Sequence, residues 1–131
     1  MILPYEPKGK GKRLKEPELD IVRGTLDLLI LKTLSWGPLH GYAIASVIRQ
    51  QTDKALLVEE GALYPGLYRM ESKGWIEAEW GLSENNRQAK YYQLTAEGRR
   101  HLRSEAKTWK AYTEAVTKVL QATQLPARES S

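Results

Sequence analysis

The chain has 131 residues, of which 41% are hydrophobic and 27% are charged, and its formal net charge is +4. This length and composition predict one globular domain with one modest hydrophobic core. The sequence has no cysteine and only two histidines, which excludes disulfide scaffolds, cysteine nucleophiles and thiolate metal sites. No apolar run reaches the roughly 18 residues of a membrane span, and the start of the chain lacks the apolar core of a signal peptide. We therefore expect a cytoplasmic protein that is not an enzyme and that needs no cofactor or metal.

The first part of the chain is rich in proline, glycine and lysine. In residues 1–15, five basic side chains stand against Glu6, an excess of +4 that equals the net charge of the whole chain. Such a segment cannot bury apolar area, so we predict a flexible basic arm over residues 1–18. A solvated tail is the favoured interpretation, and an arm that contacts DNA phosphates is the alternative.

Apolar periodicity next predicts three short helices, over residues 20–35, 41–51 and 61–73. Gly37-Pro38 ends the first helix, and Gly74 ends the third. In the third helix, Leu63, Leu67 and Met70 share one face and should point into the core.

The hydrophobic period then shortens to about two residues, which indicates β-structure. Residues 76–80 alternate apolar and acidic side chains and predict a strand whose apolar face, including Trp80, is buried. Residues 90–94 predict a second strand. The polar residues 81–88 join the two strands, and Asn85 and Asn86 suit a turn, so a β-hairpin with a connection of about eight residues is expected.

The last predicted helix starts after Thr95, its N-cap, and continues to about residue 123. Leu102, Trp109 and Val116 recur every seven residues. A stripe of apolar and small side chains results, which comprises Leu102, Ala106, Trp109, Tyr112, Val116, Val119 and Leu120. Because a helix this long cannot bury the whole stripe against so small a core, we predict a homodimer through this stripe. The alternative is a helix folded back along its own chain.

The predicted fold class is mainly α with a small β-hairpin, an α+β fold. Three helices followed by a hairpin form a winged helix-turn-helix over residues 19–95, in which the third helix enters the DNA major groove. A dimerisation helix over residues 96–124 and a flexible tail over residues 125–131 complete the chain.

The outward face of the third helix is the first candidate DNA-binding surface. It carries Pro65, Tyr68 and Arg69, with Tyr64 at its border. Arginine can bind guanine, and tyrosine hydroxyls reach phosphates or base edges. Pro65 is unusual there, because it removes a backbone hydrogen bond. A solvated face with two packed tyrosines is the alternative interpretation.

The tip of the hairpin is the second candidate surface. It carries Arg87 and Lys90, whose side chains can donate to phosphates. A hairpin loop is polar by default, so an ordinary solvated loop remains the alternative. His40, before the second helix, is expected to cap or pack rather than to act as a ligand or base.

The ordered motifs resemble those of PadR-family regulators, across residues 24–102. The matching segments are residues 24–31, 37–42 and 61–67, Glu71, residues 74–76 and 91–95, and Gly98. The resemblance implies a winged helix whose last helix dimerises, and transcriptional repression that a small molecule often relieves. The single C-terminal helix is similar to the short-tailed branch of the family.

The resemblance also implies a place for Tyr42 and Ala62 among the DNA-binding residues. The sequence departs from the family at Glu60 and Ala62, where many members carry serine or threonine. These hydroxyls would have contacted phosphate or capped the helix. Glu59 and Glu60 favour the helix dipole but are unfavourable beside phosphate.

The function expected from these features is a homodimeric repressor that binds an inverted repeat in double-stranded DNA. A winged-helix module that binds another protein instead of DNA is the alternative. Trp109 and Tyr112, paired across a two-fold axis, could bind a flat aromatic effector. The alternative is that both rings simply fill the interface.

Overall fold

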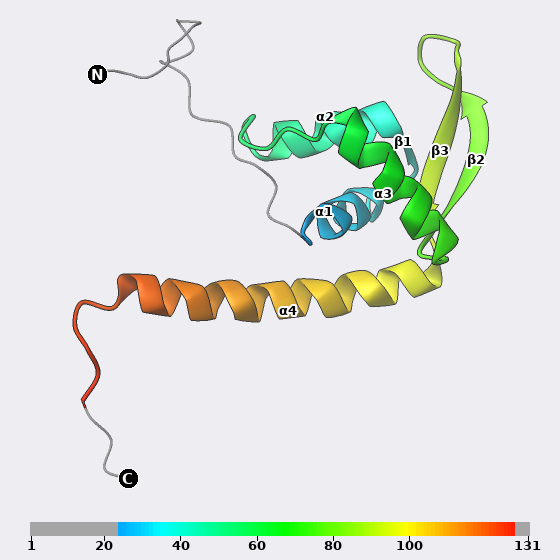
Figure 1. The fold of residues 1–131 in the computed structure, drawn as a ribbon. Coiled ribbons are helices and arrows are strands. Elements are labelled where there is room, and N and C mark those ends of the chain that lie inside the picture. The colour runs from blue at the N-terminus through cyan, green and yellow to red at the C-terminus, as the bar shows by residue number, and fades with distance from the viewer. Residues whose placement is uncertain (1–23, 128–131) are drawn as a thin grey trace, which may run out of the picture.

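The structure is a computed structural model that describes residues 24–127. Its elements are α1 (Leu26–Leu34), β1 (Leu39–His40), α2 (Gly41–Gln51), α3 (Glu60–Ser72), β2 (Ile76–Leu82), β3 (Gln88–Leu94) and α4 (Ala96–Gln121). This order confirms the α+β class and the winged helix-turn-helix followed by one long helix (Figure 1). The predicted basic arm, residues 1–18, and residues 128–131 of the predicted tail lie outside the described residues.

Helix α1 is the central helix of the core, because Ile30, Leu31 and Leu34 are all buried. This helix begins later than the predicted start near residue 20, which itself lies outside the described residues. Gly24 adopts a φ of +88°, a left-handed conformation that interrupts a helix, and α1 starts at Leu26.

Helices α2 and α3 lie where the periodicity predicts them, and local signals fix their ends. The Nδ1 atom of His40 accepts a hydrogen bond of 3.2 Å from the backbone N–H of Ala43, which confirms His40 as the cap of α2. At the end of α3, Gly74 has a φ of +81°. The N–H of Trp75 donates to the carbonyl of Met70 over 3.1 Å. This is the 6→1 hydrogen bond of a Schellman motif, which spans more residues than the accompanying 5→2 bond.

The sheet has three antiparallel strands in the order β1-β3-β2. The strands of the hairpin are longer than predicted, since Ile76 pairs with Leu94 and Leu82 pairs with Gln88. Residues 83–87 are therefore the whole connection, with Asn86 at a φ of +62°. We call β2, β3 and this connection the wing.

The wing extends beyond the hydrophobic core (Figure 1). The core is built from buried side chains of α1, α2, α3 and the sheet: Ile30, Leu31, Leu34, Ile44, Ile48, Val58, Leu63, Leu67, Met70, Ile76, Tyr92 and Leu94. Along β2, Ile76 is 1% exposed but Trp80 is 64% exposed. The prediction that Trp80 is buried is wrong, because the strand continues past the helices that cover its start.

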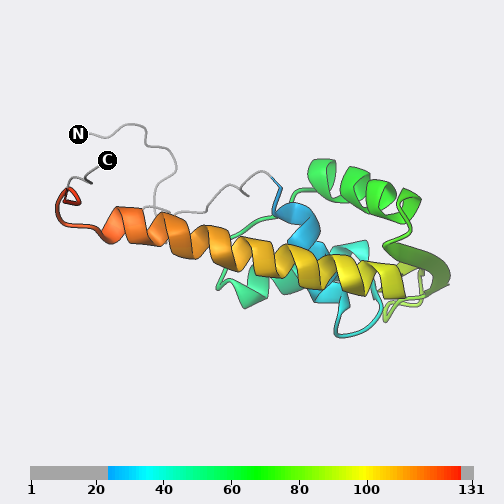
Figure 2. The same cartoon turned by 90° about the horizontal axis from the view of Figure 1, so that it is seen from below.

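Helix α4 is joined tightly to the base of the wing. The hydroxyl of Thr95 accepts from the N–H of Gly98 over 3.0 Å, which confirms the predicted cap, and donates to the carbonyl of Gly74 over 2.6 Å. The rings of Trp75 and His101 stack with centroids 3.7 Å apart. From this joint α4 runs past α1 and away from the other helices and strands (Figure 2).

Helix α4 ends at Gln121, earlier than the predicted residue 123. Ala122 has an extended backbone with a ψ of 139°, which cannot continue a helix. Leu102, near the start of the helix, packs against the core, whereas Val119 and Leu120 are 75% and 78% exposed. The far end of α4 therefore carries apolar side chains that the described part of the chain leaves open.

Candidate nucleic-acid interface

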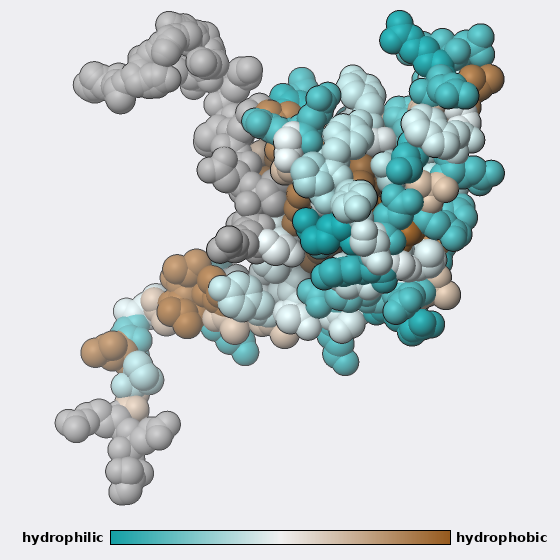
Figure 3. All heavy atoms as spheres, turned by 45° about the vertical axis from the view of Figure 1, so that its right-hand side comes forward, coloured by the Kyte–Doolittle hydropathy of each residue, from teal (hydrophilic) through white to brown (hydrophobic). Residues whose placement is uncertain are grey.

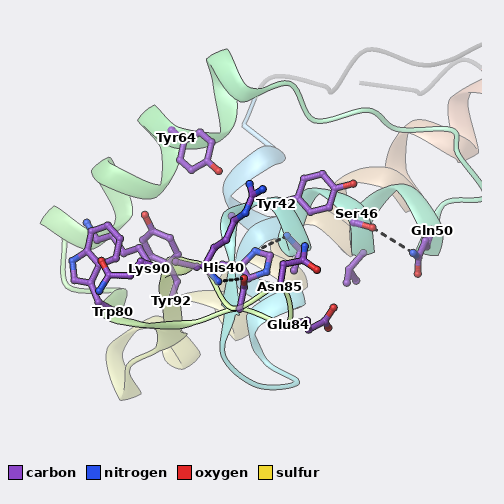
Figure 4. A pocket seen from close by; sticks show the side chains of 17 residues that line it. His40, Tyr42, Ser46, Gln50, Tyr64, Trp80, Glu84, Asn85, Lys90 and Tyr92 are labelled. Carbon is purple, nitrogen blue, oxygen red and sulfur yellow. Dashed lines mark hydrogen bonds between the residues drawn. The ribbon is translucent and has the colours of Figure 1, made fainter.

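A groove of about 860 Å³ separates α2 and α3 from the wing. It brings together four of the residues predicted to bind DNA. Tyr42 and Tyr64 line its helical side, and Arg87 and Lys90 line the side of the wing (Figure 4). Side chains from three separate elements and the wing connection thus converge on one open concave surface.

The helical side of the groove depends on Gly41. A Cβ atom at this position would lie 2.7 Å from the hydroxyl oxygen of Tyr64 and 2.8 Å from its ring. The absence of a side chain therefore lets the Tyr64 ring lie against the first turn of α2. Tyr42 follows on the same turn and is exposed, so the groove gains two tyrosine rings whose hydroxyls are suited to donate to phosphate oxygens.

The wing side of the groove contributes the cations. Lys90 lies with its Nζ atom 3.4 Å from a carboxylate oxygen of Glu71 and 5.7 Å from the ring centroid of Tyr92. These contacts hold the lysine between the wing and the end of α3. Arg87 is exposed at the end of the wing connection, and its backbone N–H donates to the hydroxyl of Ser83 over 3.3 Å.

Tyr92 forms the floor of the groove beneath Lys90 and is 6% exposed. Its burial raises the pKa of its hydroxyl above the ordinary value, while the charge of Lys90 opposes the shift and that of Glu71 adds to it. The phenol therefore stays neutral at physiological pH, and the charges beside it are those of the ion pair between Lys90 and Glu71.

The other predicted residues of α3 lie outside the groove. Ala62, Pro65 and Tyr68 are exposed, as the amphipathic pattern predicts, and Leu63, Leu67 and Met70 are buried on the opposite face. Pro65 stands inside the helix.

Arg69 is also exposed, but it is not free. Its guanidinium forms an ion pair with the carboxylate of Asp27 on α1. The structure thus places Arg69 at the junction of α3 and α1, apart from the wing cations.

The groove also contains residues that sequence reasoning did not assign. They include the polar side chains Ser46 and Gln50 and the aromatic side chain Trp80. Gln50 donates to the hydroxyl of Ser46 over 3.3 Å on the outer face of α2. Their spacing of one helical turn could have marked this face, whereas the alternating pattern of β2 assigned Trp80 to the core.

The predicted stripe on α4 is the second candidate surface. The rings of Trp109 and Tyr112 lie 6.1 Å apart at an angle of 35°, and both are exposed. Val116 is 38% exposed. Hydrophobic side chains gather toward the C-terminal end of α4 (Figure 3). Leu102 belongs partly to the core of its own chain, so the open part of the stripe starts later than predicted.

Residues 24–127 contain neither a candidate membrane span nor a candidate metal site. In this range no helix combines the length and the apolar character needed to cross a bilayer. The same residues contain no cluster of three or more histidine or carboxylate side chains arranged to hold a metal ion.

Comparison with known proteins gives consistent matches. The model of the Transcriptional regulator PadR-like family matches residues 30–104. Protein X of Lysinibacillus sphaericus is 33% identical over 97 residues, which cover 74% of this chain and 89% of that protein.

Two solved structures match with similar coverage. A PadR family transcription regulator from Clostridium difficile has 31% identity and a TM-score of 0.65, over 74% of this chain and 99% of its own. A transcriptional regulator from Clostridium thermocellum has 31% identity and a TM-score of 0.67, over 73% of this chain and 93% of its own.

Proposed function

Because the chain belongs to the PadR-like family of transcriptional regulators, we propose that it is a homodimeric repressor that binds an inverted repeat in double-stranded DNA. The observation that carries this proposal is the groove, in which Tyr42 and Tyr64 face Arg87 and Lys90. Hydroxyl and cationic donors on two sides of a concave surface suit the sugar–phosphate strand of a duplex. The protein would act in the cytoplasm, where it can reach the chromosome.

The proposed docking places α3 in the major groove. Ala62, Pro65 and Tyr68, exposed on one side of α3, would then face base edges, and one DNA strand would pass through the groove between α2 and the wing. Arg69 would bind a base only after its ion pair with Asp27 is broken. An ion pair this exposed contributes only about 0–1 kcal/mol, so a bidentate contact with guanine would compensate for its loss.

The proposed dimer rests on the open part of the α4 stripe. Trp109, Tyr112 and Val116 follow one another on one face of the helix, together with Val119 and Leu120, and all are more than one third exposed. An apolar row of this length on a helix is typical of a helix–helix contact. A second copy of α4, related by a two-fold axis, would cover it and present two DNA-reading domains to two half-sites.

The test is a titration of duplex DNA at several salt concentrations. The duplex is first selected by the protein from a random-sequence pool. We expect an inverted repeat that binds two chains, with an affinity that falls steeply as salt rises. A reporter gene with this duplex across its promoter should be silenced by the protein. A protein-interaction module would instead show no salt-dependent affinity for any duplex, and that result would refute the proposal.

We further propose that a flat aromatic effector binds beside Trp109 and Tyr112 in the dimer. Two pairs of these rings across a two-fold axis would offer stacking faces and hydroxyls. Planar aromatic compounds should then quench the fluorescence of the parent but not that of Trp109→Leu, and should release the selected duplex. A solved dimer in which the two Trp109 rings pack tightly with no cavity would contradict this part of the proposal.

A further inference from the structure

The apolar row of β2 continues beyond the core that it serves. Ile76, Ala78, Trp80 and Leu82 alternate along the strand and so lie on one face of the wing. The row starts fully buried at Ile76 and ends with Trp80 and Leu82 about two thirds exposed. The large indole of Trp80 is therefore exposed to solvent, on the face of the wing that is turned toward the helices.

This exposed indole lines the groove of the proposed DNA interface. Trp80 shares the groove with Tyr42, Tyr64 and Arg87, and Figure 4 shows it beside Lys90 and Tyr92. Lys90 is its partner across the strands, but the ammonium of Lys90 is directed to Glu71 and to the ring of Tyr92. The groove thus combines cationic and hydroxyl donors and the acidic side chain of Glu84 with aromatic rings, of which the indole of Trp80 is the largest.

A DNA strand presents the same two chemistries in alternation. Its phosphates are anionic, whereas the faces of its deoxyribose rings are apolar. Arg87 and the tyrosine hydroxyls suit the phosphates, whereas the sugars suit the apolar faces of aromatic rings. An indole covers a sugar face well, because it offers a broad apolar surface at little conformational cost.

We infer that Trp80 is a further DNA-binding residue, which packs against a deoxyribose of the strand held in the groove. This inference rests on the proposed function and assigns a contact in which no charged group takes part. Since every nucleotide carries the same sugar, the contact strengthens binding to all sequences equally. It also leaves unchanged the number of phosphates that the protein neutralises.

The experiment compares Trp80→Ala and Trp80→Phe with the parent on two duplexes, over a range of salt concentrations. One duplex is that selected by the parent, and the other is a scrambled duplex of the same composition. Trp36→Ala is the matched control, because Trp36 is also exposed, at 62%, but does not line the groove. Unfolding midpoints of all variants are measured alongside.

We expect Trp80→Ala to lose about tenfold in affinity, near the lower end of the range known for aromatic side chains stacked on bases. The loss should be equal for the two duplexes, and the dependence of affinity on salt should keep the slope of the parent. Trp80→Phe should retain most of the affinity, and Trp36→Ala all of it. DNA should quench the parent more than Trp80→Phe, and this difference reports the indole directly.

Three results would overturn the inference while leaving the proposed function intact. They are an unchanged affinity of Trp80→Ala, a loss confined to the selected duplex, and a flatter salt slope. A parent protein that binds no duplex at all would overturn the proposed function itself, and the inference with it.

Discussion

At the residue scale, a close backbone contact that only glycine permits joins the start of α4 to the turn after α3. A Cβ atom on Gly98 would lie 1.9 Å from the carbonyl oxygen of Trp75. Because this carbonyl belongs to the backbone, it cannot move aside as a flexible side chain could. The first turn of α4 is thus pressed directly against the turn that follows α3, and this contact fixes where the long helix begins.

Gly98→Ala should therefore destabilise the protein. We expect the free energy of unfolding to fall by about 2–3 kcal/mol, as for other overpacked sites, although alanine favours helix by about 1 kcal/mol. Gly61→Ala is the control, because a Cβ atom there would meet nothing within 4 Å, and it should be neutral or slightly stabilising. Urea unfolding at one protein concentration measures both. Equal midpoints for the two variants would show that the contact at Gly98 is unimportant.

Tyr92 gives a second prediction, on stability in alkali. Burial raises the pKa of its hydroxyl above the ordinary value of about 10, so the folded state holds this proton more tightly than the unfolded state does. Its contribution to stability is complete below pH of about 10 and is lost as the pH rises through the folded-state pKa.

Tyr92→Phe should remove this loss and move the alkaline unfolding midpoint to higher pH, as followed by circular dichroism. Tyr68→Phe serves as the control, because Tyr68 is 73% exposed and its variant should unfold in alkali like the parent. A Tyr92→Phe variant with an unchanged alkaline midpoint would show that this ionisation does not limit the fold.

At the element scale, local signals in the sequence predicted the helices well. The bounds of α2, the Schellman turn at Gly74 and the Thr95 cap all depend on neighbouring residues, which a single sequence displays. Strand β1 was missed, since its two residues form a strand only by pairing with β3. Trp80 was misplaced for a related reason, because an alternating pattern does not tell how far the covering helices extend.

The candidate site was predictable to a similar extent. Tyr64 could be chosen from the outward face of its helix, Arg87 and Lys90 from the tip of the hairpin, and Tyr42 from the family resemblance. These four side chains do converge on the groove. The ion pair between Arg69 and Asp27 was not predictable, because it joins residues 42 positions apart in the chain. Its existence depends on how α3 packs across α1.

In the proposed docking, that ion pair distinguishes Arg69 from the cations of the wing. Arg69→Ala should weaken binding to the selected duplex by about 1–3 kcal/mol and relax the preference at one base pair. Asp27→Asn should release the arginine and strengthen binding by up to about fivefold, since exposed ion pairs contribute little. Electrophoretic mobility shifts with single-base variants of the duplex measure both effects.

Arg87→Ala provides the contrast. It should weaken binding to every sequence alike and reduce the salt slope by about one, because it removes one contact to phosphate. The proposed docking would be wrong if Arg69→Ala and Arg87→Ala both bound as tightly as the parent.

At the scale of the whole molecule, α4 has a polar face and an apolar face. Its polar face carries pairs such as Lys110 and Glu114, whose charged atoms lie 2.6 Å apart. Its other face carries the stripe that starts in the core at Leu102 and continues past it. One continuous helix therefore serves the fold at one end and offers an open surface at the other.

Trp109→Asp should weaken the proposed dimer strongly, because an unpaired charge in an apolar interface costs several kcal/mol. Sedimentation at micromolar concentration should show a dimer for the parent and a monomer for this variant. Lys107→Ala changes the net charge by the same amount on the polar face and should remain dimeric. A parent that sediments as a monomer and still binds DNA tightly would refute the dimer.

The rigid joint at Gly98 makes α4 a lever. Its 26 residues span about 39 Å at about 1.5 Å per residue, and the joint leaves little freedom at one end. A rotation of only about 5° at the far end would displace the DNA-reading domain by about 3 Å, close to the rise of about 3.4 Å per base pair. In the proposed dimer, a slight change of the angle between two α4 helices would therefore shift the two domains by one base pair relative to their half-sites.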